Sequence, residues 1–170
     1  MIAKYVKGVV YVFIDAANIF YAQKTMKWRI SYVGLKKYLQ KECNLGECFV
    51  YTAYVKNNKN QARFLKMLSK AGLIVRTKPV KTIKVREGVY QWKGNLDVEL
   101  TIDVLENLEK FDSLILFSGD SDFAPLLKRV KEHGKRVIVA STKDHVAKEL
   151  LEQAKFVNLK KLEQEIKLKK

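Results

Sequence analysis

The sequence predicts an α/β protein with a mostly parallel sheet that helices cover on both faces. Short apolar runs rich in β-branched and aromatic residues alternate with longer segments whose apolar residues recur at helical spacing. Two of the runs, residues 9–14 and 114–117, contain no charged residue, which is typical of strands buried on both faces. Because parallel strands need crossover connections, the alternation of the two element types favours a parallel sheet.

The same periodicities place the other elements in chain order. The chain between them shows no linker, repeat or low-complexity tract, so we expect one domain over residues 1–170 with a core of about 9–157. Besides the strands at 9–14 and 113–117, strands are expected at 48–55, 73–75, 136–140 and, at an edge, 156–157. Helices are expected after Asp15 with Asn18 as the cap, then at 31–41, 60–71, 96–108, 122–133 and 144–154.

Two segments do not fit this alternation. Residues 79–93 alternate in polarity around a Glu87-Gly88 turn, which indicates an irregular segment or a hairpin and not a central strand. Residues 158–170 are predicted to form a charged C-terminal helix. Three roles are compatible with this helix: docking on the protein, a dimer contact, or a simple solvated end. The solvated end is the default expectation.

The composition constrains the kind of partner. Lys and Arg number 33 against 18 acidic residues, a net charge of +15, and such an excess indicates a polyanionic partner, either nucleic acid or an anionic surface. No apolar segment reaches membrane-spanning length and the amino terminus lacks a signal-peptide pattern, so a cytoplasmic protein is expected. The chain has two cysteines and two histidines, which are poor in number and placement for a structural zinc site. We therefore expect both cysteines to be reduced thiols.

Four aspartates fall where strands end or helices begin. Asp15 follows the run at 9–14, Asp120 and Asp122 follow the run at 114–117, and Asp97 lies in the first turn of a predicted helix. Ligands in open α/β sheets bind beyond the carboxyl ends of the strands, where these side chains would converge. Carboxylates without His or Cys suit Mg²⁺ or Mn²⁺. Such a cluster can activate water and stabilise charge in phosphodiester cleavage.

Three blocks of the sequence resemble a known family. Residues 13–18 (FIDAAN), residues 93–97 (KGNLD) continuing to Asp103, and residues 118–123 (SGDSDF) are similar in order and spacing to the signature blocks of the NYN (LabA-like, DUF88) branch of PIN-like nucleases. The similarity runs from about residue 9 to residue 157. It implies a three-layer α/β/α sandwich with a PIN-like, Rossmann-like sheet, and metal-dependent cleavage of RNA.

The resemblance also implies roles for individual residues. The acids that would bind Mg²⁺ or Mn²⁺ are Asp15, Asp97, Asp120 and Asp122. Asn18 would orient Asp15 or bind a phosphate, Lys93 would neutralise the scissile phosphate, and Ser118 would hydrogen-bond a metal ligand. Asp103 also matches an acidic position, but it lies six residues beyond Asp97 and about 240° around a helix, so it ranks below the others.

Most of the positive charge is concentrated in one part of the chain. Residues 56–93 contain eleven basic residues and one acid, which favours nucleic acid over a merely solvated face. Tyr90 and Trp92 could stack on unpaired bases or belong to the core. The residues expected to contact nucleic acid are Arg63, Lys81, Lys84, Arg86, Trp92 and Lys93.

These observations favour a metal-dependent ribonuclease acting on single-stranded or flexible RNA. The alternative is an RNA-binding regulatory module without turnover. A phosphatase is a weaker third reading, because Ala16 and Ala17 follow Asp15 where a second acid would be needed. The oligomeric state is undecided, and a homodimer is reasonable because the predicted sheet has exposed edges.

Overall fold

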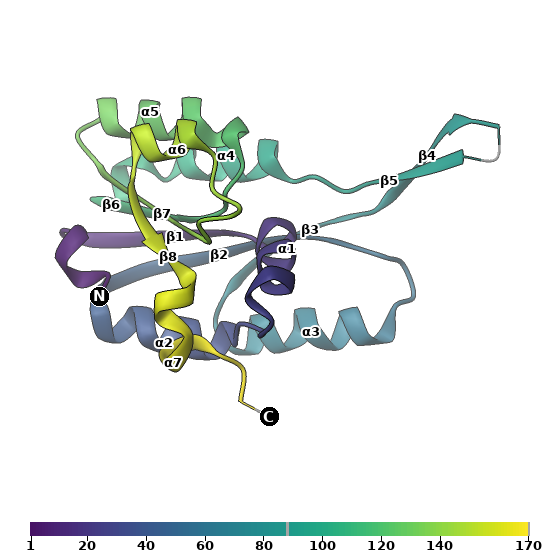
Figure 1. The fold of residues 1–170 in the computed structure, drawn as a ribbon, viewed down its shortest axis with the longest axis horizontal. Helices are drawn as coiled ribbons and strands as arrows, with labels where there is room; N and C mark the ends of the chain where they lie inside the picture. The colour runs from purple at the N-terminus through teal and green to yellow at the C-terminus, as the bar shows by residue number, and fades with distance from the viewer. Residues whose placement is uncertain (88, 170) are drawn as a thin grey trace.

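The structure, a computed structural model, contains a six-stranded parallel sheet and a separate two-stranded hairpin (Figure 1). It describes residues 1–87 and 89–169, and the side chains of residues 83, 85 and 89–93 lie outside this description. The order of strands in the sheet is β3-β2-β1-β6-β7-β8. The strands of the sheet are β1 (Val9–Asp15), β2 (Asn44–Tyr54), β3 (Ile74–Pro79), β6 (Ser113–Phe117), β7 (Arg136–Ser141) and β8 (Lys155–Asn158).

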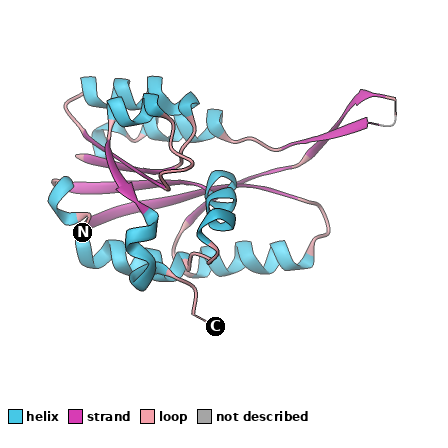
Figure 2. Ribbon diagram, in the orientation of Figure 1, coloured by secondary structure: helices cyan, strands magenta, loops and turns pink. Residues whose placement is uncertain are grey.

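Helices cover both faces of the sheet, which confirms the predicted fold class (Figure 2). On one face lie α1 (Ala16–Met26), α2 (Tyr32–Glu42), α3 (Lys59–Lys70) and α7 (Glu163–Ile166). On the other lie α4 (Asp97–Glu106), α5 (Ala124–Glu132) and α6 (Lys148–Gln153). None of the helices in the described ranges is long and apolar enough to cross a membrane.

The central strand β1 shows why the strand sequences contain no polar alternation. Val10, Val12 and Ile14 belong to the apolar cluster on the α1–α3 side, whereas Tyr11 and Phe13 belong to the cluster on the α4–α5 side. Successive side chains of a strand point to opposite faces. Both faces of β1 therefore need apolar residues, and the ordinary hydrophobic-polar alternation is lost.

Of the two alternatives predicted for residues 79–93, the hairpin is the one present, and it extends away from the body of the molecule (Figure 1). Its strands β4 (Lys81–Arg86) and β5 (Val89–Lys93) pair antiparallel with each other and not with the main sheet. The chain then returns through Gly94, where a Cβ atom would lie 2.5 Å from the Cβ of Ala53. Only glycine allows this loop to approach β2 so closely.

The C-terminal segment differs from the single solvated helix that was expected. A 3₁₀ turn at Leu159–Leu162 leads into the short helix α7, and Leu159, Leu162 and Ile166 are fully buried. The backbone of Ser31 donates a hydrogen bond to the carbonyl of Ile166 over 2.8 Å. The segment docks against α2 because its apolar residues complete the core on that face.

Two other predicted helix starts were also wrong. Asp15, and not Asn18, caps α1 by accepting hydrogen bonds from the amides of the first turn. The helix expected from residue 144 begins at Lys148, because the preceding loop is held to the end of β6 by a hydrogen bond from the Ala147 amide to the Gly119 carbonyl.

Candidate metal centre

The end of β1 and the end of β6 deliver acidic residues to one edge of the sheet. The two strands are parallel neighbours, with Ile14 paired to Phe117. The strand order reverses direction between them, which is where ligands bind in open α/β sheets. Asp15, Asp120 and Asp97 line the same cavity of about 380 Å³. The predicted convergence of these segments therefore occurs.

Three carboxylates gather most closely at this edge. Asp97, Asp120 and Asp122 each offer an oxygen atom, and these atoms all lie within 4.8 Å of one another. Within the described part of the chain, no ion pair neutralises any of the three. Burial raises the pKa of Asp97, and the charges of Asp120 and Asp122 raise it further. Oxygen ligands crowded in this way fit a hard divalent cation.

Asp15 lies in the same cavity but outside this group of three. Its Oδ1 atom accepts hydrogen bonds from the amides of Ala17 and Asn18, both over 3.1 Å. Its Oδ2 atom accepts a hydrogen bond of 3.1 Å from the Ser118 hydroxyl. Burial raises the pKa of Asp15, and the negative charge of Asp97 raises it further. The hydrogen bonds lower this pKa, but the net shift is upward.

Asn18 and Ser118 connect the two loops that carry the acids. The Asn18 side-chain oxygen accepts a hydrogen bond of 2.9 Å from the Gly119 amide, and the Ser118 hydroxyl accepts one of 3.2 Å from the Asp120 amide. A Cβ atom on Gly119 would lie 1.8 Å from the carbonyl oxygen of His145. The position of Asp120 thus depends on a glycine packed against the loop that follows β7.

A local hydrogen-bonded turn presents Asp97. The Asn95 side-chain oxygen accepts a hydrogen bond of 2.6 Å from the Asp97 amide, and the Asn95 side-chain amide donates to Asp97 Oδ2. Lys78 of β3 forms an ion pair of 2.7 Å with Glu99, which lies two residues after Asp97 in α4. The positive charge of Lys78 partly offsets the rise in the pKa of Asp97.

Asp103 takes part in a different interaction. Its Oδ2 atom accepts hydrogen bonds from the Tyr51 hydroxyl over 2.7 Å and from Arg76 Nε over 2.8 Å, and its Oδ1 atom accepts from Arg76 Nη2 over 3.2 Å. Asp103 is buried, with 8% of its surface exposed. The structure therefore brings it together with Arg76 and Tyr51 and not with the group of three.

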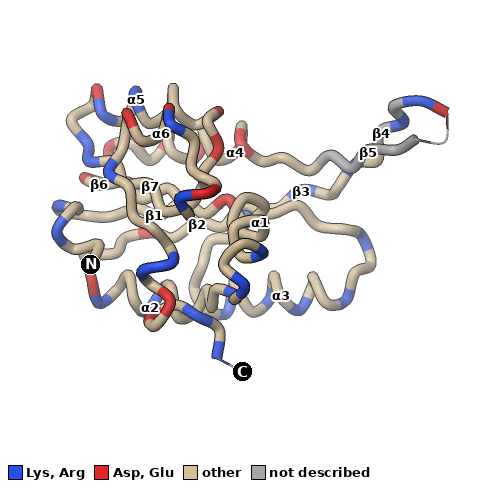
Figure 3. Tube along the Cα trace, in the orientation of Figure 1, with Lys and Arg blue, Asp and Glu red and all other residues tan. Residues whose placement is uncertain are grey.

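The basic residues predicted to contact nucleic acid lie on exposed surfaces where they are described. Arg63 lies on α3, and Lys81, Lys84 and Arg86 lie on β4 (Figure 3). The side chains of Lys93, Trp92 and Tyr90 fall outside the described residues. Their roles stay predictions.

Two further hollows open at the same edge of the sheet. One of about 760 Å³ adjoins the acid cavity and contains Phe20 and Tyr21, two residues that sequence reasoning missed. The signal for them in the sequence was two aromatic residues in succession, separated from the FIDAAN block by Ile19 alone. A helical pattern alone does not reveal that both are exposed.

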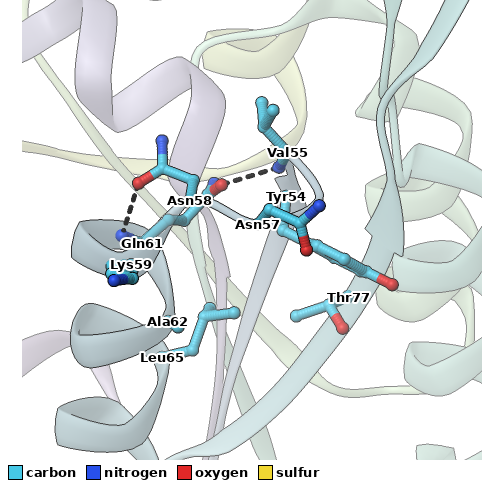
Figure 4. Close-up of a pocket in the computed structure, with 9 residues that line it drawn as sticks. All are labelled: Tyr54, Val55, Asn57, Asn58, Lys59, Gln61, Ala62, Leu65 and Thr77. Carbon is cyan, nitrogen blue, oxygen red and sulfur yellow. Dashed lines mark hydrogen bonds between the residues drawn. The ribbon is translucent and has the colours of Figure 1, made fainter.

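The other hollow, of about 680 Å³, lies between the β2–α3 loop and β3 (Figure 4). Asn58 accepts a hydrogen bond of 3.0 Å from the Gln61 amide at the start of α3. Gln61 in turn accepts one of 2.7 Å from the Val55 amide and donates one of 2.7 Å to the Ala53 carbonyl. These bonds hold the loop close to the end of β2.

Comparison with known proteins agrees with the fold. The chain is 32% identical over 143 residues to the low amplitude and bright protein LabA of Synechococcus elongatus, covering 82% of this chain and 76% of LabA. A crystal structure of a protein of unknown function from Vibrio parahaemolyticus superposes with a TM-score of 0.79 at 25% identity, covering 95% of this chain and 97% of that one. The NYN domain profile matches residues 9–160. This chain belongs to the NYN domain family.

Proposed function

We propose that this protein is a metal-dependent ribonuclease that hydrolyses phosphodiester bonds of RNA at the cavity containing Asp15, Asp97 and Asp120. The observation that carries the proposal is the group of three carboxylates from two separate segments, crowded within 4.8 Å. Acids brought this close repel one another unless a cation is present. Their all-oxygen donor set suits Mg²⁺ or Mn²⁺.

The acidic residues of the site have two proposed roles, binding a cation and accepting a proton. Asp97, Asp120 and Asp122 would hold the cation, which supplies positive charge to activate an attacking water and to stabilise charge on the phosphate. Asp15 is fixed by Ser118 and by two helix amides. Its raised pKa suits a group that accepts a proton from water near this site.

Exposed basic residues outside the cavity suit a polyanionic substrate. Arg63 lies on α3, and Lys81, Lys84 and Arg86 lie on β4 of the hairpin. A single strand that contacts such residues releases counterions, so its binding weakens steeply with salt. Lys93 and Trp92 are proposed to contribute to the same surface, on the strength of their place in the sequence.

The test is cleavage of a fluorescently labelled single-stranded RNA in Mg²⁺ or Mn²⁺ by the wild-type protein and by Asp120→Asn. We expect the variant to lose on the order of 10²-fold in rate or more. Asp144→Asn, which changes an exposed acid paired with Lys160, is the matched control and should cleave like the wild type. Equal cleavage by Asp120→Asn and the wild type would contradict the mechanism.

The rival function is RNA binding without turnover. The name of the cyanobacterial relative, low amplitude and bright, does not describe an enzyme. Salt-sensitive RNA binding that persists in EDTA, with no cleavage products in either metal, would favour a regulatory module over a ribonuclease.

A further inference from the structure

A mostly apolar groove of about 760 Å³ adjoins the acid cavity at the carboxyl edge of the sheet. Its walls come from α1, the end of β2, the start of α3 and the docked C-terminal segment. The residues that line both the groove and the acid cavity are Ala17, Tyr21, Thr52, Ala53 and Gly94. A polymer with one unit at the acids would therefore place a neighbouring unit in this groove.

Two aromatic side chains on α1 stand open to solvent at the groove. Phe20 is 56% exposed and Tyr21 is 59% exposed, with ring centroids 5.9 Å apart and planes at 74°. The helix is anchored to the core by other residues, Ile19, Ala22 and Met26. Since burial of a large apolar side chain is favourable, two aromatic rings left in water beside a site indicate a ligand that covers them.

A cation lies over both rings. Lys24 Nζ is 4.9 Å from the centroid of Phe20 and 5.0 Å from that of Tyr21, and Arg29 also lines the groove. Within the described residues, neither side chain takes part in an ion pair with an acid. An apolar aromatic surface flanked by available positive charge complements a ligand that has both a flat ring and a phosphate.

We propose that this groove binds an unpaired nucleobase of the substrate strand, next to the bond placed at the acid cavity. The base stacks on Phe20 or Tyr21, and Lys24 moves from the rings to the flanking phosphate. Only an unpaired base has a free face to offer, so the site selects single-stranded substrates. This inference rests on the proposed function for the identity of the polymer.

The test measures stacking without cleavage. The Asp120→Asn protein is kept in EDTA and titrated with a single-stranded RNA that carries one fluorescent 2-aminopurine, whose emission falls when the base stacks. We expect the parent protein to quench the probe. Removing both rings, with Phe20→Ala and Tyr21→Ala, should abolish the quenching and weaken binding by about tenfold or more.

Further variants separate stacking from general loss of structure. Tyr21→Phe retains the ring and should bind like the parent. Leu151→Ala removes an exposed apolar side chain, 43% exposed, from α6 on the opposite face of the sheet, and should also bind like the parent. Lys24→Gln should retain quenching but reduce the log–log salt slope of binding by about 0.7, the loss of one phosphate contact.

Three results would overturn the inference. The first is equal quenching and affinity in the double variant and its parent. The second is equally tight binding of the same RNA annealed to its complement. The third is a double variant that changes the oligomeric state in light scattering but leaves RNA binding intact, since the groove would then be an interface between copies.

These results are independent of the nuclease activity itself. If the 2-aminopurine probe is quenched as expected but the wild-type protein yields no metal-stimulated products, the base site stands and the ribonuclease proposal fails. If cleavage is normal and the probe is not quenched, the base site fails alone.

Discussion

Replacing Asp120 with Asn changes the charge at the acid cluster with little change in shape. Asp120 Oδ1 accepts a hydrogen bond of 3.0 Å from the Asp122 amide and so caps the 3₁₀ turn at Ser121–Phe123. Asparagine is as good a cap as aspartate. The substitution therefore removes one negative charge from the group of three and leaves the local hydrogen bond in place.

The size of the effect follows from the spacing of the carboxylates. Two unit charges at 4.8 Å repel by about 3.5 kcal/mol at an effective dielectric of about 20 and by about 0.9 kcal/mol in bulk water. Asp97 is partly buried and Asp122 is exposed, so the relief lies between these limits. In EDTA, Asp120→Asn should unfold with a free energy at least about 1 kcal/mol above the wild-type value, which raises Tm by about 2–4 °C.

Thermal unfolding with and without Mn²⁺ tests this reasoning. At a concentration of about 100 Kd, Mn²⁺ should stabilise the wild type by about 2.7 kcal/mol, and Asp120→Asn should lose most of this gain. Asp144→Asn is the matched control: it loses an ion pair with Lys160, so its stability in EDTA should fall slightly while the metal effect persists. A variant less stable than the wild type in EDTA, with an undiminished Mn²⁺ effect, would refute the electrostatic account.

Three other expectations concern the same edge of the sheet. Gly119→Ala should lower the free energy of unfolding by about 2 kcal/mol and diminish the Mn²⁺ shift, because its methyl group collides with the loop after β7. Asp103→Asn should cost about 2 kcal/mol in urea unfolding, since Arg76 loses its charged partner, yet leave the Mn²⁺ shift unchanged. Burial raises the pKa of both Asp15 and Asp97 above the ordinary value of 3.8, so these two carboxyl groups hold more protons in the folded protein than in the unfolded chain between that value and the raised ones. In EDTA, urea titrations should therefore show that the free energy of unfolding of the wild type falls, relative to that of an Asp97→Asn variant, as pH rises through this window, and a relative rise there would contradict the assignment.

The convergence of Asp15 and Asp120 could be predicted from sequence because it depends on topology alone. An acid that directly follows a buried parallel strand must lie at the carboxyl edge, whatever the details of packing. A hairpin is one of the two alternatives that the sequence indicates for residues 79–93, because its alternating polarity and turn signal are local. Features of this kind need no knowledge of which elements pack against which.

The orientation of helix faces could not be predicted in the same way. In α4, Leu100 and Val104 are buried, whereas Val98 is 68% exposed and Ile102 is 49% exposed. The helix thus has two apolar faces, and periodicity alone does not say which one meets the sheet.

The same limitation applies to the C-terminal segment. Leu159, Leu162 and Ile166 lie among six charged residues between positions 155 and 167, yet they complete the core on the α2 face. Their burial depends on a gap left by other elements, which is a property of the assembled fold and not of the segment.

The hairpin has a further consequence through its connection to α4. Three residues, 94–96, separate the end of β5 from Asp97, and Gly94 is packed tightly against β2. A ligand that grips Lys81, Lys84 and Arg86 and draws on this short connection would shift one carboxylate relative to the other two. Thermodynamic linkage then requires the cation and the ligand to alter each other's affinity by one common factor, so a ligand on the protruding hairpin and a cation at the distant acids would be coupled.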